Sequence, residues 1–213
     1  MDTTYYHYKR DTIVPATIFT LLYATWAILV SSGSQLIRNF DKTVINAICN
    51  HNAASVKFTT AFTNLGNTSV IVVETIIICV VLAFCRKYAF AFFTAGTMIT
   101  ANGYNWLIKH AVERQRPLTH HLVDAHGYSF PSGHSVGSAA LFGVLIVLTI
   151  LLVRNWTVRS LLCFIWALFP LLIGYTRIFS HVHYPSDVVG GFLGGIAFVL
   201  IGYTFLFHYY LEE

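Results

Sequence analysis

The sequence predicts an all-α polytopic membrane protein in which six transmembrane helices form one bundle. Hydrophobic residues make up 56% of the 213 residues, charged residues make up 10%, and the mean hydropathy is +0.64. The apolar residues stand in blocks close to the length of about 20 residues that crosses a bilayer. Because lipid offers backbone N–H and C=O groups no partner, such blocks have to be helices. A soluble helical protein is disfavoured, because so little polar surface cannot cover its core.

Six apolar blocks follow one another along the chain. They cover residues 12–31, 68–85, 88–108, 133–153, 160–179 and 188–209. The first block follows the basic stretch YKRD, but no small-residue cleavage pattern follows it, so it is interpreted as a span and not as a signal peptide. The polar segment 32–66 is expected to hold a short amphipathic helix around DKTVINAICN at the membrane surface.

No linker, repeat or low-complexity run divides the chain, which predicts a single membrane domain over 1–213, with a core of distinctive motifs at about 88–210. The four cysteines (Cys49, Cys79, Cys85 and Cys163) have no C-x-x-C spacing and are interpreted as small buried residues. The net charge is only +4, and no basic tract with interleaved aromatics indicates nucleic-acid binding. The expected partners are the bilayer and a lipid.

Six spans place both termini on the same side of the membrane. Basic residues divide six to seven between the terminal side and the other side, so counting alone does not orient the chain. The six on the terminal side, however, lie in short connections such as the RK pair at 86–87 and the stretch RNWTVR. We therefore expect a multi-pass protein of the cell membrane, with cytoplasmic termini and an active site on the extracytoplasmic side.

Parity alone places four block ends at one membrane face: the end of the third, the start of the fourth, the end of the fifth and the start of the sixth. These ends carry most of the unusual polar residues of the chain, namely Lys109, Arg116, Ser132, Gly133, His134, Arg177, His183 and Asp187. Ionisable residues at membrane depth are costly and are usually functional. This face is therefore the expected functional site.

The stretch KHAVERQRP ends the third block. Lys109 and Arg116 are seven residues apart, about two helical turns, so on a continued helix they share a face. Two fixed cations suit a multiply charged anion, with Arg116 as a planar donor fork and Lys109 as a point charge. Glu113 lies four residues after Lys109 and offers an alternative, a salt-bridged helix end that anchors the span to headgroups.

The stretch YSFPSGHS begins the fourth block. Pro131 and Ser132 are typical of a helix start, and Gly133 allows a ligand close to the backbone. The free N–H groups of the first turn favour an anion. His134 stands where it can transfer a proton near pH 7. The alternative is an ordinary capped helix with an interfacial histidine.

The stretch RIFSHVHYPSD joins the last two blocks. Arg177 adds a third cation, and His183 precedes Asp187 by four residues, with Pro185 and Ser186 marking a helix start between them. That spacing lets the carboxylate bind one ring nitrogen and leave the other free to act as a nucleophile. The alternative is a capping aspartate beside an interfacial histidine. Together, three cations, helix-end amides and two histidines fit the binding and transfer of a phosphoryl group.

At these residues the sequence resembles the type 2 phosphatidic acid phosphatases, membrane members of a superfamily that includes the vanadium haloperoxidases. Three family signatures, Lys-x6-Arg-Pro, Pro-Ser-Gly-His and Arg-x5-His-x3-Asp, occur in order as KHAVERQRP, PSGH and RIFSHVHYPSD. The third is often preceded by Ser, and Thr176 stands there instead. The resemblance covers the last four blocks closely, whereas residues 1–66 match only in general character.

The resemblance implies a lipid phosphatase that needs no metal or other cofactor and works through a phosphohistidine. It assigns the nucleophile to His183, the orienting carboxylate to Asp187, and the general acid and base to His134. The residues that it assigns to the phosphoryl oxygens are Lys109, Arg116, Ser132, Gly133 and Arg177. One histidine must then be neutral and the other protonated, so their pKa values should be pushed apart.

Several alternatives stay open at this level. The loop LTHHLVDAHGYSF carries His120, His121, Asp124 and His126, which are either a metal site or a solvated substrate rim. Glu74, Asn102 and Asn105 either hydrogen-bond between helices or line the path of a lipid. The substrate is a phosphatidic acid, a phosphatidylglycerophosphate or a prenyl pyrophosphate such as undecaprenyl pyrophosphate, since apolar walls discriminate weakly between tails. A non-catalytic membrane binder or transporter of a phosphorylated lipid is the second class of function.

Overall fold

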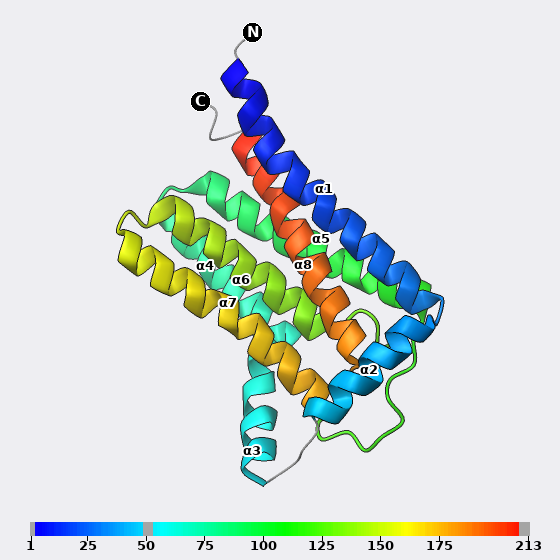
Figure 1. Ribbon diagram of the computed structural model, residues 1–213. Helices are drawn as coiled ribbons and strands as arrows, with labels where there is room; N and C mark the ends of the chain where they lie inside the picture. Colours follow the sequence, from blue (N-terminus) through cyan, green and yellow to red (C-terminus); the bar gives the residue numbers. More distant parts are fainter. Residues whose placement is uncertain (1–2, 49–52, 209–213) are drawn as a thin grey trace.

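The computed structural model describes residues 3–48 and 53–208, and in these ranges the chain forms helices and no strand (Figure 1). The α-helices are α1 (Thr3–Ser31), α2 (Gln35–Ile48), α3 (Ala53–Phe62), α4 (Thr68–Phe84), α5 (Tyr88–Val112), α6 (Gly133–Leu152), α7 (Trp156–Phe179) and α8 (Pro185–Leu206), and a 3-10 turn η1 covers Thr63–Gly66. The predicted all-α class is therefore confirmed, and every predicted block coincides with a helix. Tyr209, the last residue of the sixth block, lies outside the described ranges.

The predicted count of six spans is not confirmed. In the described residues, α1, α6, α7 and α8 are long and apolar enough to cross a membrane. α4 has only 17 residues and meets that standard only together with Val56–Gly66, from which it is bent by 49°. α5 has 25 residues, but polar side chains such as Asn102, Asn105 and Lys109 interrupt its apolar surface. α5 therefore does not meet the standard for a span, although it coincides with the third predicted block.

The outer surface of the bundle carries large apolar side chains. Phe84, Phe92 and Ile99 on α4 and α5 are 91%, 71% and 72% exposed. Exposed apolar surface of this extent is typical of a face that meets lipid and not water. The described part of the chain therefore has the surface of a multi-pass membrane protein.

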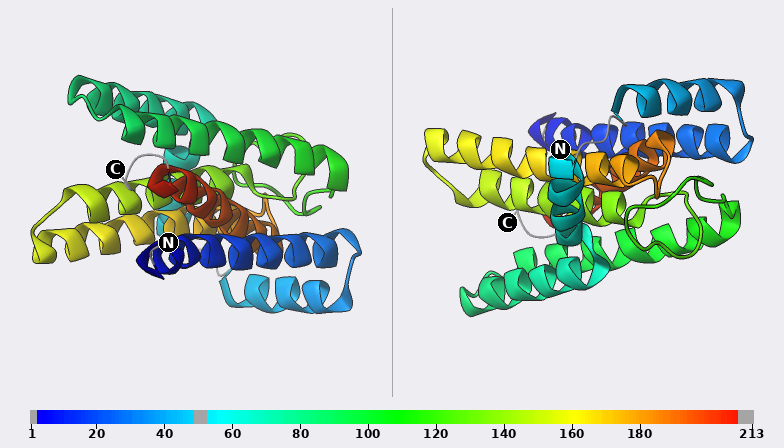
Figure 2. Two further views of the ribbon diagram at one scale, coloured as in Figure 1. Left: turned by 90° about the horizontal axis from the view of Figure 1, so that it is seen from above. Right: turned by 90° about the horizontal axis from the view of Figure 1, so that it is seen from below.

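Helix α8 runs through the middle of the bundle and packs against α1, α5 and α6, as Figure 2 shows. Glycines let α8 and α6 approach closely. A Cβ atom on Gly191 would lie 2.6 Å from Cβ of Ser135, and one on Gly195 would lie 2.7 Å from Cβ of Ala139. Small residues at a helix crossing are typical of membrane bundles. This contact holds the N-terminus of α6 beside the N-terminus of α8.

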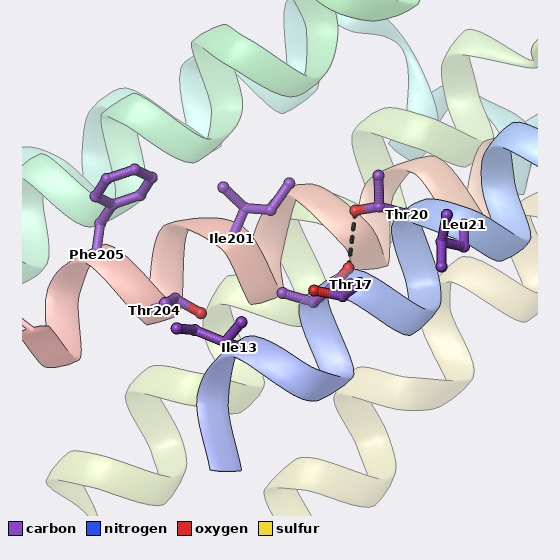
Figure 3. A pocket seen from close by; sticks show the side chains of 8 residues that line it. Ile13, Thr17, Thr20, Leu21, Ile201, Thr204 and Phe205 are labelled. Atoms are coloured by element: carbon purple, nitrogen blue, oxygen red, sulfur yellow. Dashed lines mark hydrogen bonds between the residues drawn. The ribbon is translucent and has the colours of Figure 1, made fainter. Parts of the chain in front are cut away.

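Helices α1 and α8 also pack together, and near the termini they leave a cavity of about 260 Å³. Figure 3 shows its lining, which consists of apolar side chains and three threonines. The hydroxyl of Thr20 donates to the carbonyl of Ala16 at 2.8 Å, and that of Thr204 donates to the carbonyl of Leu200 at 2.9 Å. These hydroxyls are thus satisfied by their own helices.

The opposite end of the bundle is covered by α2, α3 and the long loop between α5 and α6 (Figure 1). α2 is the amphipathic helix that the sequence predicts: Ile37 and Asp41 are buried against the bundle, whereas Arg38 and Lys42 are exposed. Residues 49–52, including Cys49, lie outside the described ranges. The helix α3 with its 3-10 turn is not predicted from the sequence, where 32–66 is interpreted as a surface segment with a single helix.

Candidate active site

The three motifs of the last four helices meet at the end of the bundle that α2 covers. The end of α5 and the following loop, the start of α6, the end of α7 and the start of α8 all lie there (Figure 1). The backbone N–H of Ser132 donates to the carbonyl of Asp187 at 3.1 Å, which joins the starts of α6 and α8. The charges of Lys109, Arg116 and Arg177 all act on His134. The structure therefore brings the predicted site residues together.

His183 and Asp187 form the centre of this site. Nδ1 of His183 lies 3.5 Å from Oδ2 of Asp187, and the two side chains are 2% and 0% exposed. Oδ2 also accepts bonds from the hydroxyl of Ser129 at 2.5 Å and from the N–H of Tyr184 at 2.9 Å. On the other side of the imidazole, Nε2 lies 3.2 Å from Nη1 of Arg116. One ring nitrogen thus faces a carboxylate, and the other faces a cation.

Burial sets the charge of His183. Burial lowers the pKa of His183 to about 3, although the hydrogen bond and the charge of Asp187 act in the opposite direction. The imidazole is therefore neutral near pH 7, with a lone pair on one nitrogen. If the proton lies on Nδ1, where Asp187 accepts it, then Nε2 is the basic and nucleophilic atom.

Arg116 owes its position beside His183 to backbone carbonyls. Nη1 donates to the carbonyl of Val182 at 2.7 Å, Nη2 donates to that of His126 at 2.8 Å, and Nε donates to that of Gly127 at 3.0 Å. These bonds hold the guanidinium in one orientation. Arg116 is therefore fixed by a loop and not by a helix.

This arrangement corrects the expected geometry of KHAVERQRP. The helix does not continue to Arg116, because α5 ends at Val112 and Glu113 takes a left-handed backbone conformation with φ of 50°. Lys109 and Arg116 therefore do not share a helical face. The alternative salt bridge is absent from the described contacts as well: Glu113 accepts a bond from the hydroxyl of Tyr128 at 2.7 Å, whereas Lys109 donates to the carbonyl of Tyr128 at 2.8 Å.

Arg177 completes the set of cations from the end of α7. It is 4% exposed, and its Nη1 donates to the hydroxyl of Thr63 at 2.8 Å. Its Nε is buried without a hydrogen-bond partner in the described part of the protein. A buried donor without an acceptor is costly, and an anion would satisfy it. Arg177 thus offers a donor to a ligand.

The start of α6 provides the second histidine. Ser132 caps the helix, its hydroxyl accepting a bond from the N–H of Ser135 at 3.4 Å. His134 follows in the first turn, and its Nε2 lies 2.9 Å from Oδ1 of Asn67, at the bend between η1 and α4. A Cβ atom on Gly133 would lie 3.5 Å from Nδ2 of Asn105, so a side chain of α5 lies next to this glycine. His134 is therefore held by a residue from the N-terminal part of the chain.

Four residues of the site are not predicted from the sequence: Asp41, Asn67, Arg114 and Ser129. Arg114 stands inside KHAVERQRP, two residues before Arg116, and its Nη1 donates to Oδ1 of Asp187 at 2.6 Å. A signal for Asp41 exists, because it is an acidic residue on the apolar face of an amphipathic helix. Asn67 and Ser129 have no comparable signal, since both stand among ordinary polar loop residues.

The histidine-rich loop does not assemble a metal site. Among the described residues no group of three or more His, Cys, Asp or Glu side chains is placed to hold a metal ion. Nε2 of His121 instead lies 2.9 Å from the carbonyl of Pro117, within the loop itself. His126 contributes its backbone carbonyl to Arg116. The loop thus shapes the rim of the site and supports one of its cations.

The chain is similar to known proteins in sequence. A family model described as the PAP2 superfamily matches residues 86–210. Phosphatidylglycerophosphatase B of Bacillus subtilis (strain 168) is 31% identical over 144 residues, which are 67% of this chain and 71% of that protein. The lipid A 1-phosphatase of Rhizobium johnstonii is 33% identical over 105 residues, which are 45% of this chain and 39% of that protein.

Two crystal structures share the fold. The first transmembrane PAP2 type phosphatidylglycerolphosphate phosphatase from Bacillus subtilis has a TM-score of 0.80 at 24% identity, over 89% of this chain and 94% of that one. LpxE of Aquifex aeolicus has a TM-score of 0.61 at 24% identity, over 76% of this chain and 93% of that one. The likeness extends beyond the matched motifs to the arrangement of the whole bundle.

Proposed function

This chain belongs to the PAP2 superfamily, as its three motifs predict, and we propose that it hydrolyses the phosphate of a membrane lipid through a phosphohistidine at His183. As a membrane phosphatase of this family it is an enzyme that acts on lipid phosphates. One observation carries the finer proposal. His183 is a buried, neutral imidazole with Nδ1 toward Asp187 and Nε2 toward Arg116. A binder of phosphorylated lipids needs the cations but no such nucleophile.

In the proposed first step, Nε2 of His183 attacks phosphorus as the bond between phosphorus and the lipid oxygen breaks. His134 donates a proton to the departing oxygen, which leaves as an alcohol or, from a pyrophosphate, as a lipid monophosphate. In the second step His134 removes a proton from water, whose oxygen attacks phosphorus. The P–N bond breaks and inorganic phosphate leaves. Asp187 stabilises the positive charge that develops on His183 in the first step.

Charge complementarity supports phosphate as the group that this site binds. Lys109, Arg116 and Arg177 converge on the same end of the bundle, and the free amides of the first turn of α6 add a positive dipole end. Such preorganised donors stabilise the charge of a phosphoryl group in its transition state. We therefore propose that these residues, with Ser132 and Gly133, hold the phosphoryl oxygens, and that no metal or other cofactor is required.

An apolar groove beside the site supports a lipid as the leaving group. It lies between α4 and α5, has a volume of about 420 Å³, and is lined mainly by apolar side chains, together with Thr68, Thr75 and Asn102. Its lining begins at Thr68, next to the Asn67 that contacts His134. We propose that the lipid chain lies in this groove while its phosphate reaches His183. Among candidate substrates we place phosphatidylglycerophosphate first, because phosphatidylglycerophosphatase B of Bacillus subtilis matches 67% of this chain.

Phosphate release by the purified protein in detergent tests the proposal. The panel contains phosphatidylglycerophosphate, phosphatidic acid and undecaprenyl pyrophosphate, with His183→Ala as the inactive control. We expect turnover of at least one lipid and the highest kcat/KM with phosphatidylglycerophosphate. If the wild type binds these lipids but releases no phosphate, the chain is the non-catalytic binder or transporter.

We also propose cytoplasmic termini and an extracytoplasmic active site. The short basic connections α4–α5 and α6–α7, with Arg86, Lys87 and Arg154, lie at the end of the bundle opposite the site, and basic loops favour the cytoplasm. Leu118, in the loop at the site, is fully exposed. In a cysteine-free background, Leu118→Cys and Thr119→Cys should react with impermeant thiol reagents in intact cells. Labelling only after permeabilisation would reverse the orientation.

A further inference from the structure

We infer that Asp41 of α2 and Arg114 form a clamp that positions Asp187, so that α2 belongs to the machinery of the site and is not merely a cover over the end of the bundle. The inference rests on the proposed roles of His183 and Asp187. Neither clamp residue belongs to the positions that define the three motifs, and Asp41 lies far upstream of them. Both are positioning residues, because they act on the reaction through Asp187.

The guanidinium of Arg114 bridges two buried carboxylates. Its Nη1 donates to Oδ1 of Asp187 at 2.6 Å, and its Nη2 donates to Oδ2 of Asp41 at 2.8 Å. Asp41 is 4% exposed and Asp187 is 0% exposed, whereas the Arg114 side chain is 19% exposed. A buried carboxylate requires a hydrogen-bonded counter-charge, and the planar fork of arginine serves two acceptors at fixed angles. The bridge therefore fixes both the charge and the rotation of Asp187.

Asp41 also holds the first turn of α8. Its Oδ1 accepts a bond from the backbone N–H of Ser186 at 2.8 Å, and its Oδ2 accepts one from the hydroxyl of Ser186 at 2.8 Å. The first N–H groups of a helix have no partner within the helix, and a carboxylate is a good acceptor for them. Asp41 thus caps α8 from another helix, one residue before Asp187, and fixes the backbone that carries the carboxylate.

Aromatic side chains pack around the clamp residues. The guanidinium carbon of Arg114 lies 4.1 Å from the centre of the Tyr184 ring. Trp26 of α1 donates from Nε1 to the carbonyl of Ser186 at 2.9 Å, and its ring packs edge-on against Phe40 of α2. Residues of α2 and α8 therefore contact the guanidinium of Arg114, and Trp26 of α1 holds the backbone of Ser186 beside it.

The consequence for the reaction follows from the two oxygens of Asp187. Oδ2 faces Nδ1 of His183, and Oδ1 is the oxygen that Arg114 holds. While Oδ1 is held, the carboxylate cannot rotate, and Oδ2 keeps the imidazole proton on Nδ1 and the lone pair on Nε2. Without the bridge, Asp187 loses a neighbouring positive charge and the bond at Oδ1, and only the bonds of Ser129 and Tyr184 at Oδ2 still restrain its rotation. His183 then loses its preference for the productive tautomer while the phosphate-binding cations stay in place.

The test compares Arg114→Gln, Asp41→Asn and the double variant with the wild type, using Lys42→Gln as the matched control on the exposed face of α2. Outer partners of a reacting group typically change activity by about 10-fold to 100-fold. We expect kcat to fall about 100-fold in Arg114→Gln and about 10-fold in Asp41→Asn, with KM within about twofold of wild type. The double variant should be no slower than Arg114→Gln, because both residues act through one bridge. Arg114→Lys should recover part of the loss, since an ammonium keeps the charge but not the fork.

A second readout does not depend on activity: the tautomer of His183, measured by nitrogen NMR. The wild type should hold the proton on Nδ1, and Arg114→Gln should give a mixture of tautomers. If a folded Arg114→Gln has wild-type kcat or changes only KM, or if its tautomer is unchanged, the clamp is refuted. If Arg114→Gln fails to fold, Asp41→Asn decides the question by the same two measurements. A wild type that is inactive on every lipid refutes the proposed function instead, and the tautomer then decides the clamp alone.

Discussion

Replacement of Asp187 by asparagine removes one charge while keeping the shape of the side chain. In the wild type, Oδ2 accepts bonds from Ser129 at 2.5 Å and from the N–H of Tyr184 at 2.9 Å, and Oδ1 accepts one from Arg114 at 2.6 Å. An asparagine has one acceptor oxygen and one NH₂ group, which only donates. Whichever way the amide turns, its NH₂ group faces at least one of these donors, and one buried bond is lost.

The size of the effect follows from these contacts. A buried donor that loses its acceptor costs about 1–3 kcal/mol, so Asp187→Asn should lower the free energy of unfolding by that amount. The effect on catalysis should be larger, because the amide no longer fixes the tautomer of His183 or stabilises its positive charge. The matching aspartate-to-asparagine change in a Ser-His-Asp triad lowers kcat by about 10⁴-fold. We expect a loss of about that size.

The assay measures kcat for phosphate release in detergent together with the thermal unfolding midpoint. The exposed Asp124, in the loop between α5 and α6, provides the control Asp124→Asn, which should leave both quantities near wild type. A folded Asp187→Asn whose kcat lies within tenfold of wild type would falsify the assigned orienting role. A variant that is inactive because it is unfolded is recognised from its melting curve.

Three further outcomes are expected. His183→Ala should be inactive with its fold intact, whereas His181→Ala should retain substantial turnover. Rapid quenching should trap acid-labile phosphate on wild type and on His181→Ala but not on His183→Ala. Loss of the phospho-enzyme in His181→Ala alone would reverse the assignment. Activity should survive excess chelator, because side-chain cations neutralise the phosphoryl group. Vanadate should inhibit, because it mimics the five-coordinate transition state. Loss of activity with chelator and its recovery with one metal would instead indicate a metal site in the loop of His120 and His121. Because burial lowers the pKa of His183 to about 3, its nitrogen signals should not titrate between pH 8 and 5, and titration near pH 6.5 would show that the imidazole is not buried in solution. In the unfolded chain the His183 imidazole is protonated at a higher pH than in the folded protein. The free energy of unfolding that His183 contributes is therefore complete above about pH 6.5 and is lost as the pH falls toward 3. This loss should be smaller in His183→Gln.

The helices illustrate how far sequence reasoning reaches. Five of the six predicted blocks agree with a helix to within about four residues at both ends, because an uninterrupted apolar run and its polar flanks mark a lipid-crossing segment. The number of membrane spans is predicted less well than the helix boundaries. Polar residues within α5 and the bend before α4 arise from the demands of the site, and these demands involve partners that are distant in the chain.

The residues of the candidate site are likewise predicted only in part from the sequence. His134, His183 and Asp187 stand at helix starts within short motifs, so their spacing alone indicates a histidine with an orienting acid and a second histidine nearby. The path of the chain after α5 is not visible in that spacing, because Glu113 ends the helix by a left-handed turn, and the carbonyls that hold Arg116 come from its own loop and from the residue before His183. Sequence reasoning therefore identifies the cation but misplaces it on a helical face.

Hydropathy, parity and short-range spacing, which are local in the chain, predict a helical, apolar protein whose polar motifs gather at one end of the bundle. The resemblance of its three motifs predicts the PAP2 family. The partners of the buried charges there follow from the folded structure. Asp41 and Asp187 share one arginine across 146 residues of sequence, and Asn67 reaches His134 across a bend. The physical reason is that a buried charge accepts a partner from any segment that folding brings within about 3 Å, and no local pattern records which segment that is.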